Sequence, residues 1–327
     1  LEDAGIKILP VLLDDCEIPL FLRSRKFADC RIDFKTGMRD LLESFAISTP
    51  GHIPTVVFDE AHRQEGWHVK PTIELDYSVA ARTIPNQYKI VPHRHGQFSD
   101  DVMRQWNILI LPIPFGTLLH EVESEAIARW VYRGGGLLLC GFYFMEAHHY
   151  TTFSSLAKLL RIEYGRDLIM RQGRTSRDDA IGQTCDIRRD LCAFVEPSSS
   201  DPTHPIMSGI LKVDIQSSCT VHWVGQEADC ALEVRTDRNV SVMAPKEGVR
   251  HPTSPEKFDL VSKYAVEDAK PATFLVAAPF GRGRVVATGS WRMFVDAYMD
   301  DESVDNAKLF SNCVCWLLGA STEASQG

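Results

Sequence analysis

The stretch from Thr55 to Leu160 alternates short apolar runs with segments of helical periodicity, and this alternation constrains the fold more than any other feature of the sequence. It predicts strands over residues 55–58, 88–91, 106–111 and 137–140, and helices over residues 121–132 and 153–160. Strands separated by helices with short connections form parallel sheets with right-handed crossovers. The predicted fold class is therefore α/β: a flavodoxin-like, doubly wound and mostly parallel sheet with helices on both faces.

Two strand pairs are predicted in the C-terminal half of the chain. Residues 273–280 and 284–289 are apolar runs separated by Gly281-Arg282-Gly283, which is a strong signal for a β-hairpin. Residues 230–236 and 240–244 are also predicted to pair with each other around a short polar turn. We therefore expect a late antiparallel hairpin in addition to the parallel strands.

The N-terminal 45 residues have the pattern of an incomplete domain. Residues 6–13 form a near-continuous apolar run, which is typical of a parallel strand buried on both faces. Only one short strand (30–34) and one helix (36–45) are predicted after it, and they are too few to cover such a strand. Since the chain also begins with Leu1, we expect this part to be the C-terminal remnant of a larger domain.

The sequence thus predicts two domains and a linker. A turn-rich segment containing Ser-Thr-Pro-Gly-His-Ile-Pro marks a linker over residues 46–54. The second domain spans residues 55–319 and ends in an amphipathic helix over residues 305–318. Residues 320–327 are expected to form a disordered tail.

Composition excludes several classes of protein. The net charge of −9 argues against a general nucleic-acid-binding surface, and no apolar run approaches the ~20 residues of a membrane span, so we expect neither nucleic-acid nor membrane partners. The nine cysteines are scattered and include no C-x-x-C pair. This usage is typical of a reduced, cytoplasmic protein.

The first 45 residues resemble a known family. The resemblance lies in Lys7-Ile8-Leu9-Pro10-Val11-Leu12-Leu13, Ile18-Pro19-Leu20-Phe21-Leu22-Arg23 and Arg31-Ile32-Asp33-Phe34. Together they resemble the last third of a bacterial TIR (Toll/interleukin-1 receptor) domain. The resemblance implies that the intact parent cleaves NAD in bacterial defence or stress signalling, with a glutamate on a helix upstream of this stretch. We therefore expect this chain to lack that activity and to hold no cofactor, NAD being the substrate of the intact TIR domain.

The second domain also resembles a family, in the order and spacing of several short motifs. These are Phe58-Asp59-Glu60-Ala61-His62, Ile108-Leu109-Ile110-Leu111-Pro112, Gly134-Gly135-Gly136-Leu137-Leu138-Leu139, His204-Pro205-Ile206, Phe280-Gly281-Arg282-Gly283-Arg284-Val285-Val286-Ala287-Thr288-Gly289, Asp305-Asn306 and Trp316-Leu317. They resemble the class I glutamine amidotransferase-like superfamily. Within it, the sequence resembles the non-catalytic branch, which includes bacterial proteins of unknown role and the N-terminal domain of an intraflagellar transport subunit.

Ligands of doubly wound sheets bind outside the carboxyl ends of the strands. The residues that follow the predicted strands there, and that we expect to bind a ligand, are Glu60, His62, Phe115, Gly116, Tyr143, Ser290 and Trp291. Asp59 and His62 are the best acid–base candidates at this edge. The alternative is that Asp59 caps a turn while His62 satisfies a neighbouring carboxylate.

Cys140 is the candidate nucleophile, because it ends a predicted strand. True amidotransferases place glycine two residues before and two after the cysteine, but Leu138 and Phe142 stand there in this sequence. Their bulk would obstruct the sharp turn that glycine permits. A His-x-Glu pair is also missing after Ser290, so the sequence favours a buried structural cysteine.

The histidine clusters do not predict a metal. His93-x-His95 and the pair His148-His149, with Glu146 nearby, are the only groupings of this kind in the sequence. A metal site needs three or four converging ligands, so none is predicted.

The leading hypothesis for function is a sensor or assembly module. The second domain would bind a small molecule or a protein partner and control self-association of the TIR domain. Alternatively, it is an active hydrolase or amidotransferase that uses Cys140 or the Asp59 and His62 pair, or it is a purely structural scaffold.

Overall fold

The structure is a computed structural model that describes residues 11–12, 28–29, 53–62, 72–114, 118–145, 151–171, 194–236, 240–245, 260–262 and 271–319. The chain divides into two compact units, Leu1–Ile53 and Pro54–Gly327. The elements described in the first unit are β1 (Val11–Leu12) and β2 (Ala28–Asp29), which pair in parallel. The remainder of the strands and helix predicted before residue 46 lies outside the described residues, as does the predicted tail.

The second unit is built on an eight-stranded mixed sheet. Five neighbouring strands are parallel, in the order β17 (Gly283–Thr288), β6 (Gly136–Cys140), β5 (Ile108–Pro112), β3 (Thr55–Asp59) and β4 (Lys89–His93). Three antiparallel strands extend the sheet beyond β17, namely β16 (Thr273–Phe280), β13 (Leu232–Arg235) and β10 (Ser198–Ser199). The predicted α/β fold and the late hairpin are confirmed, and Gly281 adopts the left-handed φ of 61° that its turn requires.

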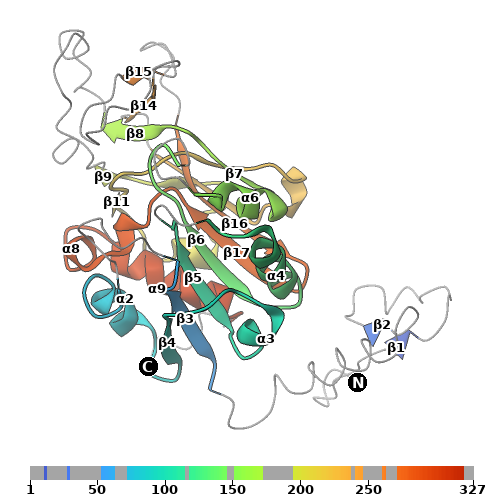
Figure 1. The fold of residues 1–327 in the computed structure, drawn as a ribbon. Coiled ribbons are helices and arrows are strands. Elements are labelled where there is room, and N and C mark those ends of the chain that lie inside the picture. Colours follow the sequence, from blue (N-terminus) through green and yellow to red (C-terminus); the bar gives the residue numbers. More distant parts are fainter. Residues whose placement is uncertain are drawn as a thin grey trace, which may run out of the picture. The chain divides into compact units, whose positions relative to one another are not determined.

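Helices cover both faces of this sheet (Figure 1). One layer contains α3 (Asp100–Met103), α4 (Glu121–Tyr132) and α6 (Phe153–Leu159). The other contains α2 (Ser78–Thr83), α8 (Asp296–Met299) and α9 (Asn306–Leu317). Every residue of β5 and β6 is buried, as expected for parallel strands between two helical layers. None of the described helices combines the length and the hydropathy that crossing a membrane requires.

Shorter elements lie around the main sheet. β14 (Val240–Pro245) pairs antiparallel with β8 (Leu168–Arg171) and with β15 (Leu260–Ser262). Two further strand pairs are β7 (Ile162–Tyr164) with β12 (Val221–Trp223), and β9 (Phe194–Val195) with β11 (Val213–Asp214). Short 3₁₀ helices are η3 (Pro205–Met207), η4 (Glu227–Asp229) and η6 (Arg292–Phe294).

The predicted hairpin between residues 230–236 and 240–244 is wrong. β13 pairs with β16 and β10 in the main sheet, whereas β14 pairs with β8 and β15 in another sheet. The local turn signal was correct in marking a break between strands. This local signal carries no information on the burial of Leu232 and Val234 in the main sheet, where both are at most 1% exposed. Burial of these side chains outweighs pairing with the next strand in sequence.

Substitution of Phe310 on α9 tests how much the packing of this helix against the sheet contributes to stability. The side chain of Phe310 is fully buried, with ring centroids 5.1 Å from Phe294 and 6.4 Å from Phe58. Phe310→Ala leaves a cavity beneath α9, so we expect the free energy of unfolding to fall by about 3–5 kcal/mol in urea denaturation. Leu211→Ala, at a side chain that is 78% exposed, serves as control and should change it by less than ~0.5 kcal/mol. Equal effects of the two substitutions would contradict this account of the core.

Candidate functional site

The five parallel strands of the main sheet end at one edge, and most of the predicted site residues gather there. Asp59 ends β3 and Cys140 ends β6. Glu60 and His62 follow β3, Tyr143 follows β6, and Ser290 and Trp291 follow β17. Phe115 and Gly116 lie outside the described residues. The edge divides into a polar part after β3 and an aromatic part after β6 and β17.

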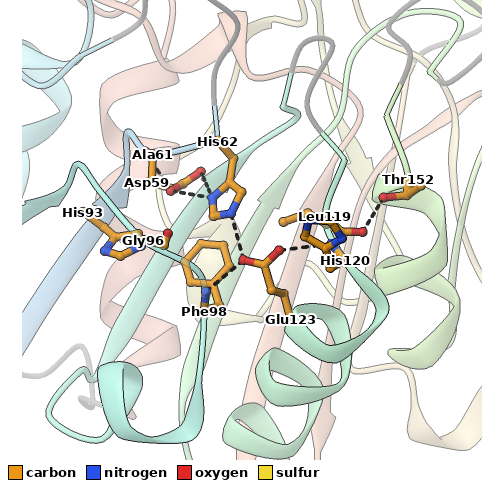
Figure 2. A network of polar contacts seen from close by, with 10 residues as sticks. All are labelled: Asp59, Ala61, His62, His93, Gly96, Phe98, Leu119, His120, Glu123 and Thr152. Carbon is orange, nitrogen blue, oxygen red and sulfur yellow. Dashed lines mark hydrogen bonds and ion pairs between the residues drawn. The ribbon is translucent and has the colours of Figure 1, made fainter.

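The polar part is a buried histidine held between two carboxylates (Figure 2). His62 Nδ1 lies 3.1 and 3.2 Å from the two carboxylate oxygens of Asp59. His62 Nε2 lies 3.0 Å from Glu123 Oε1. All three side chains are buried, with Glu123 only 1% exposed. The structure therefore brings together the predicted pair of Asp59 and His62, and adds a third member from α4.

Glu123 was not among the residues predicted for this site. It stands in the first turn of α4, where its Oε2 accepts a hydrogen bond of 3.0 Å from the backbone N–H of His120. Its Oε1 also accepts the backbone N–H of Phe98, at 2.9 Å. A glutamate three residues into a helix is the sequence signal for such a cap. Its further contact with His62, 61 residues away, follows only from the tertiary fold.

The two carboxylates fix the protonation state of His62. Each ring nitrogen faces a carboxylate oxygen, so both nitrogens must carry a proton to donate. Burial lowers the pKa of His62, but the hydrogen bonds and charges of Asp59 and Glu123 outweigh burial and leave it raised above 6.5. A buried imidazolium with both N–H groups engaged offers no free lone pair for proton abstraction. The arrangement therefore argues against His62 as a general base and fits the alternative reading, in which it satisfies neighbouring carboxylates.

Aromatic rings enclose this network on the side of β4. Phe98 stacks on His62 with ring centroids 4.5 Å apart, and His93 lies 5.2 Å from Phe98. His93 contacts the carbonyl oxygen of Gly96 at 3.2 Å. Burial is the main reason why the pKa of His93 is lowered below 6.5. His93 is therefore neutral beside the charged His62.

No group of three or more histidine, cysteine, aspartate or glutamate side chains is arranged to hold a metal in the part of the chain that the structure describes. The pair His148-His149 and the nearby Glu146 lie outside the described residues.

The carboxylate of Glu60 binds the backbone at Ile73 and the side chain of Arg94. Its Oε1 accepts the backbone N–H of Ile73 at 2.9 Å, and its Oε2 pairs with the guanidinium of Arg94 at 3.2 Å. Arg94 also pairs with Glu74. Both carboxylate oxygens of Glu60 therefore hold the segment before α2 and the end of β4 close to β3.

Cys140 lies at the end of β6 with its thiol fully buried. Burial raises the pKa of this thiol to about 12, and a hydrogen bond with Thr288 offsets only part of that rise. The flanking Leu138 and Phe142 are also buried. A nucleophilic cysteine needs a lowered pKa and access to substrate, and the environment of Cys140 provides neither.

The aromatic part of the edge is packed. The ring centroids of Phe142 and Trp291 are 5.6 Å apart, and those of Phe142 and Tyr143 are 4.4 Å apart. Burial raises the pKa of Tyr143 to about 12. Ser290 is fully buried and donates its hydroxyl to the carbonyl oxygen of Gln216. The rings of Phe142, Tyr143 and Trp291 thus pack against one another at this part of the edge.

Comparison with known proteins places the fold but not the function. The sequence matches no protein-family model and no curated protein. The chain is similar to the solved structure of the mmIFT52 N-terminal domain, with a TM-score of 0.56 and 14% identity over 82% of this chain and 98% of that one. It also aligns with Cytoplasmic Protein STM1381 from Salmonella typhimurium LT2 (TM-score 0.46, 11% identity, 80% and 99% covered) and with a putative ThuA-like protein from Bacteroides uniformis (TM-score 0.44, 11% identity, 83% and 93% covered). The likeness to the mmIFT52 N-terminal domain shows a shared fold.

The charged state of His62 predicts how stability changes with pH. Because its pKa in the folded protein is raised above 6.5, the stabilisation is fully present below pH 6.5 and is lost as the pH rises through the folded-state pKa. We expect His62→Gln to lower the free energy of unfolding by about 3–5 kcal/mol at pH 6, since it leaves two buried carboxylates without their cation. The difference in free energy of unfolding from the unsubstituted protein should shrink between pH 6 and pH 9, measured by urea denaturation.

His95→Gln, at an exposed histidine, is the control. A difference that stays constant with pH would show that His62 is not protonated.

The burial of Cys140 predicts its reactivity. Iodoacetamide should label the half-buried Cys315 of the folded protein at pH 8 more than tenfold faster than Cys140, as measured by mass spectrometry of peptides. Urea should abolish the difference. Rapid, selective labelling of Cys140 in the folded protein would instead support the nucleophile hypothesis.

Proposed function

We propose that this chain belongs to a TIR-domain protein in which a catalytically degenerate, amidotransferase-like domain acts as a sensor or assembly module. The observation that carries the proposal is the burial of Cys140 and His62 at the carboxyl edge of the main sheet. The thiol of Cys140 is buried with its pKa raised to about 12, and both ring nitrogens of His62 are held by carboxylates. A domain whose candidate nucleophile and base are both sealed is suited to binding rather than to catalysis.

The site geometry also supports a rigid module. The network of Asp59, His62 and Glu123 ties the end of β3 to the start of α4, and Glu123 also ties in the backbone at Phe98. Rigid elements of this kind present a fixed surface to a partner. In the proposed protein, a small molecule or protein partner bound to this domain controls self-association of the TIR domain. The associated TIR domains then cleave NAD in bacterial defence or stress signalling.

The alternative function is a hydrolase or amidotransferase acting through Cys140. It requires the thiol to become accessible and to meet a base, and the packing of Phe142 against Trp291 opposes both. A purely structural scaffold would have the same buried Cys140 and His62 but would need no ligand. Assembly that depends on a ligand would therefore distinguish the sensor from the scaffold.

An NAD consumption assay tests the proposal. A version of the protein with a complete TIR domain should consume NAD, and the 327-residue chain should not, because the resemblance covers only the end of a TIR domain. Deleting residues 55–319 from the complete version should lower the rate at least about tenfold and reduce the mass measured by light scattering, since assembly is lost. Cys140→Ala in the complete version is the matched control and should leave the rate unchanged. Full activity without residues 55–319 would overturn the assembly role.

A further inference from the structure

Arg292 places a positive charge at the carboxyl edge of the main sheet. It lies in η6, directly after the Ser290-Trp291 segment, and is half-buried. Its guanidinium carbon is 5.9 Å from the centre of the Trp291 ring, and its backbone N–H donates to Ser290 Oγ at 3.1 Å. The guanidinium forms no ion pair with any described side chain. A partly buried guanidinium strongly favours a carboxylate or phosphate partner, which it binds through two parallel N–H groups.

Two buried polar residues, Gln216 and Ser217, contact Ser290 and Tyr143 through their backbone. The carbonyl oxygen of Gln216 accepts the hydroxyl of Ser290, and that of Ser217 accepts the backbone N–H of Tyr143 at 3.1 Å. Ser217 is fully buried and Gln216 is 2% exposed. Ser217 Oγ and Gln216 Oε1 nevertheless have no hydrogen-bond partner in the described residues. Since buried polar atoms in native proteins nearly always have partners, these two atoms point to a bound molecule.

Backbone strain is concentrated at the same place. Phe144, Met145 and Ser217 have φ values of 58°, 44° and 59°, although none of them is glycine. Tyr143 and Ser217 are joined by a backbone hydrogen bond, so the two strained segments are in contact. Non-glycine residues in this region are rare and cluster at ligand-binding sites, where the surrounding structure must hold them.

The positive charge of Arg292 also affects the pKa of the Tyr143 side chain. Burial dominates the raised pKa of Tyr143, but the nearby guanidinium lowers it in part. Contacts through Ser290 and Tyr143 therefore join Arg292, Gln216, Ser217 and the strained backbone in the segments that follow β6 and β17.

We propose that Arg292, Ser217 and Gln216 form a binding site for a small anion that also carries a hydroxyl group. Arg292 would bind its carboxylate or phosphate, and Ser217 would donate its hydroxyl to the same group. Gln216 Oε1, an acceptor, would take the hydroxyl of the ligand. Hydroxy acids and sugar phosphates have this chemistry. The proposal rests on the proposed function, in which it supplies the ligand of the sensor.

Isothermal titration of the 327-residue chain tests this site directly. Ribose 5-phosphate, glycerate and inorganic phosphate are the probes, and at least one of the two hydroxylated anions should bind saturably and more tightly than inorganic phosphate. Arg292→Gln should weaken that binding about tenfold or more, because a charge-assisted pair is lost. Arg292→Lys, which keeps the charge but not the two parallel N–H groups, should give an intermediate affinity.

Two further variants make the test specific. Ser217→Ala should also weaken binding, whereas Arg161→Gln should not, since Arg161 pairs with Asp229 on the surface. Thermal melts of all four variants verify that each is folded. Absence of saturable binding for all three probes, or an affinity that Arg292→Gln leaves unchanged, would overturn the proposal. Equal affinity for inorganic phosphate and ribose 5-phosphate would overturn the role of Gln216. Because this chain alone is titrated, the outcome is independent of NAD consumption by the complete protein.

Discussion

Burial of the parallel strands on both faces is the constraint on which the rest of the structure depends. β5 and β6 are buried along their whole length, so the groups at the ends of the parallel strands lie at the rim of a low-dielectric core. A polar side chain in that position must find a partner within the protein. The imidazolium of His62 between Asp59 and Glu123 is one solution. It neutralises buried charge and, through the same contacts, joins β3 to α4.

The same constraint separates this edge from an active site. Catalysis needs groups whose hydrogen bonds are left incomplete until substrate arrives. The carboxylates of Glu60, after β3, and of Glu123, on α4, accept hydrogen bonds from protein groups at both oxygens. After β6, the thiol of Cys140 is buried and kept neutral. The corner around Ser217 and Arg292 differs, because polar and charged groups there remain unsatisfied among the described residues. The edge therefore has a structural part around His62 and, in our proposal, a ligand-binding part around Ser217 and Arg292.

Much of the fold could be predicted because it follows local rules. The strand over residues 137–140 and the helix over residues 121–132 agree with β6 and α4 to within one residue. The hairpin around Gly281 was equally local. The pairing of residues 230–236 with 240–244 failed because strand partners depend on burial elsewhere in the chain. For the site, Asp59 and His62 were predicted together because they stand at the end of one strand. Glu123 was missed because it becomes a neighbour of the edge only after folding.

The sequence alone determined the α/β class, the order of its elements and the edge at which polar residues gather, because apolar periodicity and turn residues act over short distances. It also indicated a non-catalytic cysteine from the bulk of Leu138 and Phe142. Only the tertiary structure decided which polar residues are satisfied. That decision depends on pairs such as His62 with Glu123, 61 residues apart, and Ser290 with Gln216, 74 residues apart. Contacts over such separations are set by how the layers pack, and no local pattern records them.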